Sequence, residues 1–231
     1  MKFENTEVWG FEHAIRGMRN PKNSWDKSDS VKCSYGVDCD YCNYDFRKCN
    51  QYYIGENDLK LMQNLIKAGA EHRKFMRQIF LSVDITAPMY FYFEFDTYKV
   101  GTVANSTSKM HKIATTPITL DCFETDDIED FEIDDLIDSI KKCEKYRTLY
   151  LETKKKKYWK ALIRQLPESW LQTRTITMNY ENLLAICSKG QRRFHKLNEW
   201  SGIDNSSLSN FISWARTLPY AQELIFLDEI N

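Results

Sequence analysis

Apolar residues recur along the chain at two spacings, which predict a mixture of strands and helices. Residues 79–85 read Ile-Phe-Leu-Ser-Val-Asp-Ile and place their aliphatic side chains on one face, as a half-buried strand does. A second, short strand is predicted over residues 174–178. Helical spacing predicts helices over residues 8–18, 57–69, 136–159, 179–188, 192–200 and from Ser206 or Ser207 to Thr217.

A nearly continuous aromatic segment, residues 89–95, follows Ala87-Pro88, where we expect the first strand to end. Its composition predicts burial on both sides. A polar run then extends from Glu94 to Lys112. A polar run that follows a buried segment can present a binding site on a scaffold; the alternative is a solvated loop with helix caps. Its candidate ligand-binding residues are Glu94, Asp96, Tyr98, Lys99, Thr102, Asn105, Ser108 and His111.

Residues 19–56 differ from the rest of the chain in composition, which predicts an irregular, Cys-containing insertion. They are polar and hold four of the seven cysteines, with the spacing Cys33-x5-Cys39-x2-Cys42-x6-Cys49. A Cys-x2-Cys pair is one half of a tetrahedral zinc site. The other pair is loosely spaced, so these four residues are a candidate zinc site, with isolated thiols as the alternative.

Composition limits the classes of function. With 231 residues and 42% hydrophobic residues the chain can form one domain, residues 1–231, with its own core. The net charge of −1 disfavours binding of extended nucleic acid, so a phosphate site must be a local patch. No apolar run of 18 residues and no apolar leader occurs, which predicts a cytoplasmic protein without a membrane partner. The aromatic content of 14% leaves apolar surface for a homo-oligomer to cover.

Two basic clusters are candidate phosphate ligands. Arg192 and Arg193 precede Trp200, and His72 precedes Arg73 and Arg77. The planar, permanently charged guanidinium suits phosphate oxygens. The alternative for both clusters is a solvated helix face.

Residues 69–111 resemble the flavin-dependent thymidylate synthases. That family has a Gly-His-Thr-Ser-Pro-Phe-Glu-His core, then a strand, a Pro and an aromatic stretch, and then Gln-x-x-Arg-His-Arg-x-x-Ser-x-Asn-Glu-x-Ser-x-Arg-Tyr. The matching positions are Gly69, His72, Phe75, Pro88, Thr102, Asn105 and Ser108. Glu94 stands at the Gln, Thr97-Tyr98-Lys99 at the Arg-His-Arg triplet, and Met110-His111 at the final Arg-Tyr. Leu166-Pro167 is similar to a later Leu-Pro, and residues 174–193 to a C-terminal strand and Asn-led helix.

The resemblance implies an α/β fold, in which helices flank a mixed sheet, and a homotetramer with sites at subunit interfaces. It divides the chain into the insertion 19–56, a synthase-like core over 57–200 and a C-terminal helical extension over 201–231. The family binds FAD, deoxyuridine monophosphate, methylenetetrahydrofolate and NADPH. By resemblance, Lys99 holds a phosphate, Glu94 and Ser108 meet the base or sugar, and Arg174, Arg192 or Arg193 comes from a neighbouring subunit.

The departures from the family fall on the flavin triplet, where two of three cationic or imidazole positions are lost. Each lost charged hydrogen bond weakens binding by about 1.5–3 kcal/mol. We therefore expect a nucleotide-binding protein that does not hold FAD in the family manner and that sequesters or senses a pyrimidine nucleotide. The alternatives are an active enzyme that transfers a methyl or hydroxymethyl group from folate, with or without flavin, and a zinc-stapled interaction protein.

Overall fold

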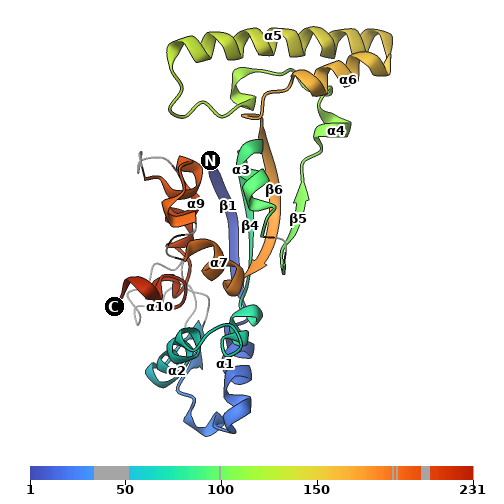
Figure 1. The fold of residues 1–231 in the computed structure, drawn as a ribbon. Helices are drawn as coiled ribbons and strands as arrows, with labels where there is room; N and C mark the ends of the chain where they lie inside the picture. The colour runs from blue at the N-terminus through green and yellow to red at the C-terminus, as the bar shows by residue number, and fades with distance from the viewer. Residues whose placement is uncertain (34–51, 99, 189, 191, 204–208, 231) are drawn as a thin grey trace. The chain divides into compact units, whose positions relative to one another are not determined.

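A four-stranded sheet has the strand order β1 (Lys2–Trp9), β4 (Phe80–Pro88), β6 (Leu171–Asn179) and β5 (Val103–Ser106). It belongs to a computed structural model, which describes residues 1–33, 52–98, 100–188, 190, 192–203 and 209–230 (Figure 1). Helices flank this sheet, as expected for an α/β fold. The α-helices of the described residues are α1 (Phe11–Arg19), α2 (Glu56–Lys67), α3 (Met89–Phe95), α4 (Lys109–Lys112), α5 (Asp130–Thr153), α6 (Lys156–Gln165), α7 (Tyr180–Cys187), α8 (Asn198–Ser201), α9 (Phe211–Ala215) and α10 (Ala221–Leu224).

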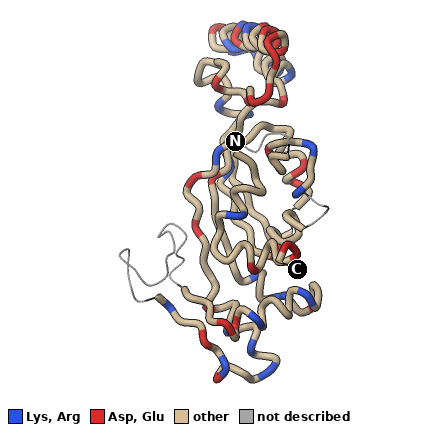
Figure 2. Tube along the Cα trace, turned by 90° about the vertical axis from the view of Figure 1, so that its left-hand side faces the viewer, with Lys and Arg blue, Asp and Glu red and all other residues tan. Residues whose placement is uncertain are grey.

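The described residues form two compact units. Unit 1 comprises residues 1–2, 84–97 and 105–175, and unit 2 comprises residues 3–83, 98–104 and 176–231. Strands β4 and β6 therefore contribute residues to both. Lys and Arg as well as Asp and Glu occur in both units (Figure 2), in keeping with the net charge of −1.

Strand β4 confirms the strand predicted over residues 79–85. Leu81, Val83, Ile85 and Ala87 are buried and alternate with more exposed residues. The strand ends at Pro88, as expected from Ala87-Pro88. Proline has no backbone N–H to donate, but its carbonyl can still accept. It can therefore be the last residue of a strand, directly before the first residue of a helix. Strand β6 confirms the second predicted strand, and β1 is a strand that the pattern did not indicate.

In unit 1, the aromatic segment 89–95 is helix α3 and is not buried on both sides. Phe91, Tyr92 and Phe95 are buried, whereas Phe93 is 54% exposed. The helical period explains this difference, because it places residues i, i+1 and i+4 on one side and residue i+2 on another.

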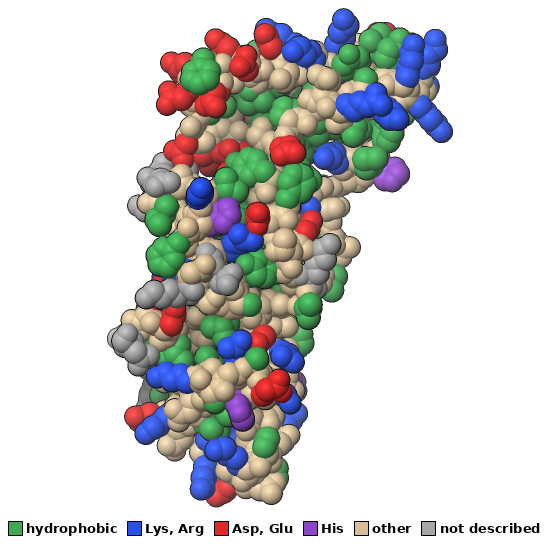
Figure 3. Space-filling model, in the orientation of Figure 1, with side chains coloured by type: hydrophobic (Ala, Val, Ile, Leu, Met, Phe, Trp, Pro, Cys, Tyr) green, Lys and Arg blue, Asp and Glu red, His purple; other side chains and the backbone are tan. Residues whose placement is uncertain are grey.

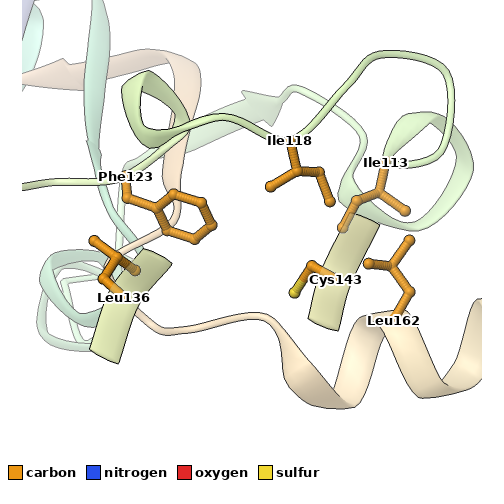
Figure 4. Close-up of a cluster of buried hydrophobic side chains, with 6 residues drawn as sticks. All are labelled: Ile113, Ile118, Phe123, Leu136, Cys143 and Leu162. Carbon is orange, nitrogen blue, oxygen red and sulfur yellow. The ribbon is translucent and has the colours of Figure 1, made fainter. Parts of the chain in front are cut away.

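The single helix predicted over residues 136–159 is two helices, α5 and α6. Lys154 has φ 55° and its N–H donates to the Tyr150 carbonyl at 2.8 Å, which ends α5. This left-handed residue reverses the chain, so that α6 packs against α5 around a shared apolar cluster (Figure 4). The cluster comprises Ile113, Ile118, Phe123, Leu136, Cys143 and Leu162.

Charge is distributed along α5 as the helix dipole favours. Glu129 and Glu132 form a capping box at its start, where acidic side chains gather, and the lysines that follow it lie at the other end (Figure 3). The acidic run and the four lysines therefore lie at the ends of α5.

In unit 2, a buried ion pair joins two helices. Arg19 of α1 donates from Nε to Asp58 Oδ1 of α2 at 2.6 Å, and neither side chain is more than 4% exposed. Asp58 Oδ2 accepts further hydrogen bonds from the hydroxyls of Ser28 and Ser30 at 2.7 and 2.6 Å. This network fixes the segment that enters the Cys-containing insertion.

The C-terminal helices differ from their predicted bounds. Residues 192–200 form a 3-10 turn over Arg192–Phe194 and then α8, so one continuous helix there is wrong. Helix α9 is capped by Asn210, whose side chain accepts from Ser213 N at 2.8 Å. The predicted caps Ser206 and Ser207 lie outside the described residues.

Of the insertion, the structure describes residues 19–33 and 52–56. There, β2 (Val31–Lys32) pairs antiparallel with β3 (Tyr52–Tyr53). Cys33 follows β2 directly, whereas Cys39, Cys42 and Cys49 lie outside the described residues. Among the helices of the described chain, none has the length and apolar character to cross a membrane.

Candidate functional site

Unit 2 contains a groove of about 570 Å³. This volume lies within the range of roughly 300–1,000 Å³ that small-molecule sites occupy. Its walls combine apolar side chains with charged groups. The lining residues are Ile66, Lys67, Arg73, Leu184, Ala185, Ser188, Leu227 and Asp228.

The groove brings together two segments that carry the family resemblance. Arg73 lies in the segment 69–75, and α7 follows strand β6 as the Asn-led helix. Asn179 caps α7, accepting from Asn182 N at 3.0 Å, while Asn182 accepts from Asn179 N at 3.1 Å. This reciprocal cap fixes where α7 begins, and therefore which of its residues face the groove.

Arg73 is anchored to α7 by an ion pair. Its Nε donates to both carboxylate oxygens of Glu181 at 3.0 Å, and the side chains are 25% and 17% exposed. Neither Nη atom of Arg73 makes a hydrogen bond to another residue of the described chain. The two Nη atoms therefore keep N–H donors that no described residue accepts.

Asp228 contributes a carboxylate whose charge is already balanced. Its two oxygens accept from Nη2 and Nη1 of Arg193 at 2.9 and 3.0 Å. Arg193 also lies 3.2 Å from Glu229. Arg193 is thus a buried structural partner of the C-terminal residues in this chain, although the resemblance makes it a nucleotide ligand.

The loop that carries the degenerate triplet is held at the start of α7 in the same unit. Asn182 Nδ2 donates to the Val100 carbonyl at 2.6 Å. Gly101 has φ +80°, and a Cβ there would lie 3.0 Å from Asn179 Nδ2. The Tyr98 ring lies 5.5 Å from the guanidinium carbon of Arg192. Two of the predicted residues, Tyr98 and Arg192, are therefore neighbours.

Unit 1 brings together another predicted pair, Asp96 and Arg174. Arg174 Nη1 donates to Asp96 Oδ1 at 2.8 Å, and its Nε donates to Gln172 Oε1 at 3.0 Å. The guanidinium lies 3.8 Å above the centre of the Tyr92 ring. With its side chain only 12% exposed, Arg174 is fixed by three neighbours of its own chain.

The remaining predicted residues are distributed over both units. In unit 1, Glu94 is half-buried and Asn105, Ser108 and His111 are exposed; Ser108 caps α4, accepting from His111 N at 3.0 Å. In unit 2, Thr102 donates to the Tyr98 carbonyl at 3.0 Å, and His72 and Arg77 are exposed. Lys99 lies outside the described residues.

Sequence reasoning missed three residues that the structure makes prominent. Arg73 stood in a basic cluster but was not chosen, and Asn179 and Asn182 were considered only as the start of a helix. An Asn directly after a strand, with a second Asn three residues later, is the signal of a reciprocal cap. It could have shown where α7 begins, but not that Asn182 also holds a distant loop.

Two of the three positions that align with the family's flavin triplet carry no cationic or imidazole side chain. Of the triplet positions, Thr97 donates its hydroxyl to the Glu94 carbonyl at 2.7 Å, and Tyr98 turns an uncharged ring toward Arg192. No group of three or more His, Cys, Asp or Glu within the described ranges could hold a metal ion. The candidate zinc cysteines fall largely outside those ranges.

No family model and no curated protein matches the sequence. Solved structures do. A flavin-dependent thymidylate synthase (ThyX) from Helicobacter pylori, complexed with FAD and dUMP, superposes over 99% of both chains with a TM-score of 0.66 and 13% identity. A second structure of ThyX from this organism with FAD and dUMP gives a TM-score of 0.67 at 14% identity, over 99% of this chain and 98% of that one.

A UMP/dUMP methylase from Streptomyces cacaoi, bound with 5-Br dUMP, is also similar. It gives a TM-score of 0.51 and 13% identity over 75% of this chain and 82% of that one. The chain therefore has the fold of the flavin-dependent thymidylate synthases, which confirms the predicted fold. The superposition on the synthases covers 99% of the chain, and it therefore includes residues outside the segments that carry the sequence resemblance.

Proposed function

We propose that the protein binds a pyrimidine nucleotide in the groove of unit 2. The observation that carries this proposal is Arg73 at a groove of about 570 Å³, whose lining also includes residues of α2, of α7 and of the C-terminal segment. The fold supports it, because similar structures have been solved with dUMP or 5-Br dUMP. The apolar side chains of Ile66, Leu184 and Leu227 supply surface for a base or sugar, and Arg73 supplies charge for a phosphate.

FAD is not the ligand in this proposal. A flavin dinucleotide carries two phosphate charges, and two of the three triplet positions that would meet them here are Thr97 and Tyr98. Two lost charged hydrogen bonds weaken binding by roughly two to four orders of magnitude. Lys99, the third member of the triplet, is the one position of the three that keeps a cationic side chain.

The site is proposed to lie at a subunit interface of a homotetramer. Apolar side chains on the surface of each unit support this assembly. In unit 2, Trp9 and Phe80 are 45% and 37% exposed and stack with ring centres 5.9 Å apart. Phe93 of unit 1 and Val103 of unit 2, the first residue of β5, are also exposed. A second copy would cover such surface, and sequestration or sensing of a nucleotide is the role we assign to the assembly.

The alternative function is an enzyme that transfers a one-carbon group from folate to a pyrimidine deoxynucleotide. The fold of a UMP/dUMP methylase favours it. Incubating the protein with dUMP and methylenetetrahydrofolate, with and without FAD and NADPH, separates the two functions. A methylated or hydroxymethylated nucleotide in the mass spectrum supports the enzyme, and unchanged dUMP supports the binding protein.

The test of the proposed function is to denature the freshly purified protein and identify what it releases by mass spectrometry. We expect a colourless protein that releases a pyrimidine nucleotide. A yellow protein that releases one FAD per chain would overturn the proposal. Metal analysis of the same sample tests the proposed zinc site of Cys33, Cys39, Cys42 and Cys49.

A further inference from the structure

We propose that Arg73 is the phosphate anchor of the groove and that Glu181 is the residue that positions it. This inference deepens the proposed function, because it assigns the ligand's charged group to a particular side chain. Its ligand class is an organic phosphate small enough for a groove of about 570 Å³.

The orientation of the guanidinium follows from its one ion pair. Glu181 occupies the Nε edge with both oxygens at 3.0 Å, so the guanidinium plane is fixed relative to α7. The opposite edge, between Nη1 and Nη2, makes no hydrogen bond to the described part of the chain. Two parallel N–H donors on that edge match two oxygens of a phosphate, which a lysine ammonium cannot do.

The surroundings strengthen this contact. Arg73 is 25% exposed, and the groove lining includes Ile66, Leu184 and Leu227. Apolar neighbours lower the effective dielectric constant, so a charge pair there is stronger than one in water. The lining also includes Lys67 and Asp228, and the carboxylate of Asp228 is paired with Arg193. An anion near Arg73 would meet the Nη edge of its guanidinium, because Glu181 occupies the Nε edge.

A purely structural role makes a different prediction. If the pair served only to join the segment 69–78 to α7, removing Arg73 would lower stability and leave ligand affinity unchanged in the folded protein. A phosphate anchor instead distinguishes a nucleotide from its nucleoside, because only the nucleotide carries the phosphate.

The experiment is a calorimetric titration of dUMP, deoxyuridine and pyrophosphate into the wild-type chain and its variants. We expect Arg73→Ala to weaken dUMP binding by about 10- to 100-fold, the loss of a charged hydrogen-bond pair, and to leave deoxyuridine binding unchanged. Arg73→Lys should fall between, because it keeps the charge and loses the fork. Lys60→Ala is the control, since Lys60 is an exposed cation of α2 that does not line the groove.

Glu181 is tested through a double-mutant cycle. We expect Glu181→Ala to weaken dUMP binding less than Arg73→Ala does, and to have no further effect in the Arg73→Ala background, because it acts through Arg73. Additive effects would contradict the positioning role. Thermal unfolding of each variant confirms that the titrated protein is folded. If Arg73→Ala does not fold, Arg73→Lys replaces it in the titrations.

The outcomes separate this inference from the proposed function. If folded Arg73→Ala binds dUMP as tightly as the wild type does, Arg73 is not the phosphate anchor, and the proposal that the protein binds a nucleotide is unaffected. Pyrophosphate binding that depends on Arg73, without dUMP binding, keeps the anchor and overturns the nucleotide. A wild-type chain that binds neither overturns both.

Discussion

Asn182 donates its side-chain amide to the carbonyl of Val100 at 2.6 Å, across 82 residues of sequence. The same side chain accepts the N–H of Asn179 through its Oδ1 at 3.1 Å, so one amide both caps α7 and holds the loop that precedes β5. The loop includes Tyr98, one of the predicted ligand-binding residues. The start of α7 thus fixes the position of the loop as well as one wall of the groove.

Replacing Asn182 by Asp should release the loop and keep the cap. The carboxylate can still accept from Asn179 N, and its charge is favourable at a helix N-terminus, but it cannot donate to Val100. We expect faster amide hydrogen exchange in residues 100–104 and a loss of about 1 kcal/mol in the free energy of unfolding. Exchange measured by mass spectrometry that is unchanged in this loop would contradict the assignment.

The buried Asp58 should make stability dependent on pH. Burial alone raises the pKa of this carboxyl, but hydrogen bonds from Ser30, Ser28 and Arg19 outweigh it and hold the pKa below its usual range. Its contribution is therefore fully present above the ordinary carboxyl pKa and is lost as the pH falls through the lowered one. Asp58→Asn leaves Arg19 buried without its charge partner, so we expect a loss of about 3–5 kcal/mol near neutral pH.

Urea unfolding at a series of pH values measures this loss. The difference in the free energy of unfolding between the wild type and Asp58→Asn should shrink below about pH 4, where Asp58 of the unfolded chain takes up a proton before the folded chain does. The exposed acid Asp26 lies on the same segment and provides the control. A difference that stays constant down to the acid transition would show that the charge of Asp58 is not what stabilises the network.

Two buried thiols should resist alkylation. Burial, with a smaller effect from Glu144, raises the pKa of Cys143 to about 11, and burial raises that of Cys187 further. Near pH 8 roughly one Cys143 in a thousand is then a thiolate, the reactive form. We expect iodoacetamide to label the half-buried Cys122 and to spare Cys143 and Cys187, as read by peptide mass spectrometry.

Denaturation supplies the control for this labelling. In concentrated urea all three thiols are exposed and should react alike. Equal labelling in the native protein would mean that the α5–α6 cluster around Cys143 opens readily in solution.

The chain should form a homotetramer. Exposed aromatic side chains such as Trp9, Phe80 and Phe93 are apolar surface that a second copy can cover. We expect light scattering at micromolar concentration to give four times the chain mass of 27.4 kDa. A monomer under these conditions would contradict both the assembly and a site shared between subunits.

The sequence predicted the elements whose pattern is set by their own side chains. Strand β4 shows strict alternation, and helix α2 has a clear apolar face and a Gly after its end. The prediction from sequence failed where contacts between distant residues determine the bounds of an element. Nothing local indicates that Lys154 adopts a left-handed conformation and splits one helix into two, since that is stabilised by the contacts between α5 and α6.

The candidate site was harder to predict for the same reason. Arg73 and Glu181 are 108 residues apart, and only the fold brings them together. Local composition could indicate that a basic cluster surrounds His72, but not which of its cations faces a groove. Arg174 and Arg193 were chosen as free cations, yet each is bound by acids of its own chain, Asp96 for one and Asp228 for the other.

The central claim is that this fold binds a nucleotide here without holding FAD in the family manner. Calorimetric titration of dUMP and of FAD, separately, into protein freed of bound ligand tests it most directly. We expect dUMP to bind and FAD to bind at least about 100-fold more weakly, the effect of two missing charged hydrogen bonds. Stoichiometric FAD binding that is tighter than that of dUMP would contradict the account.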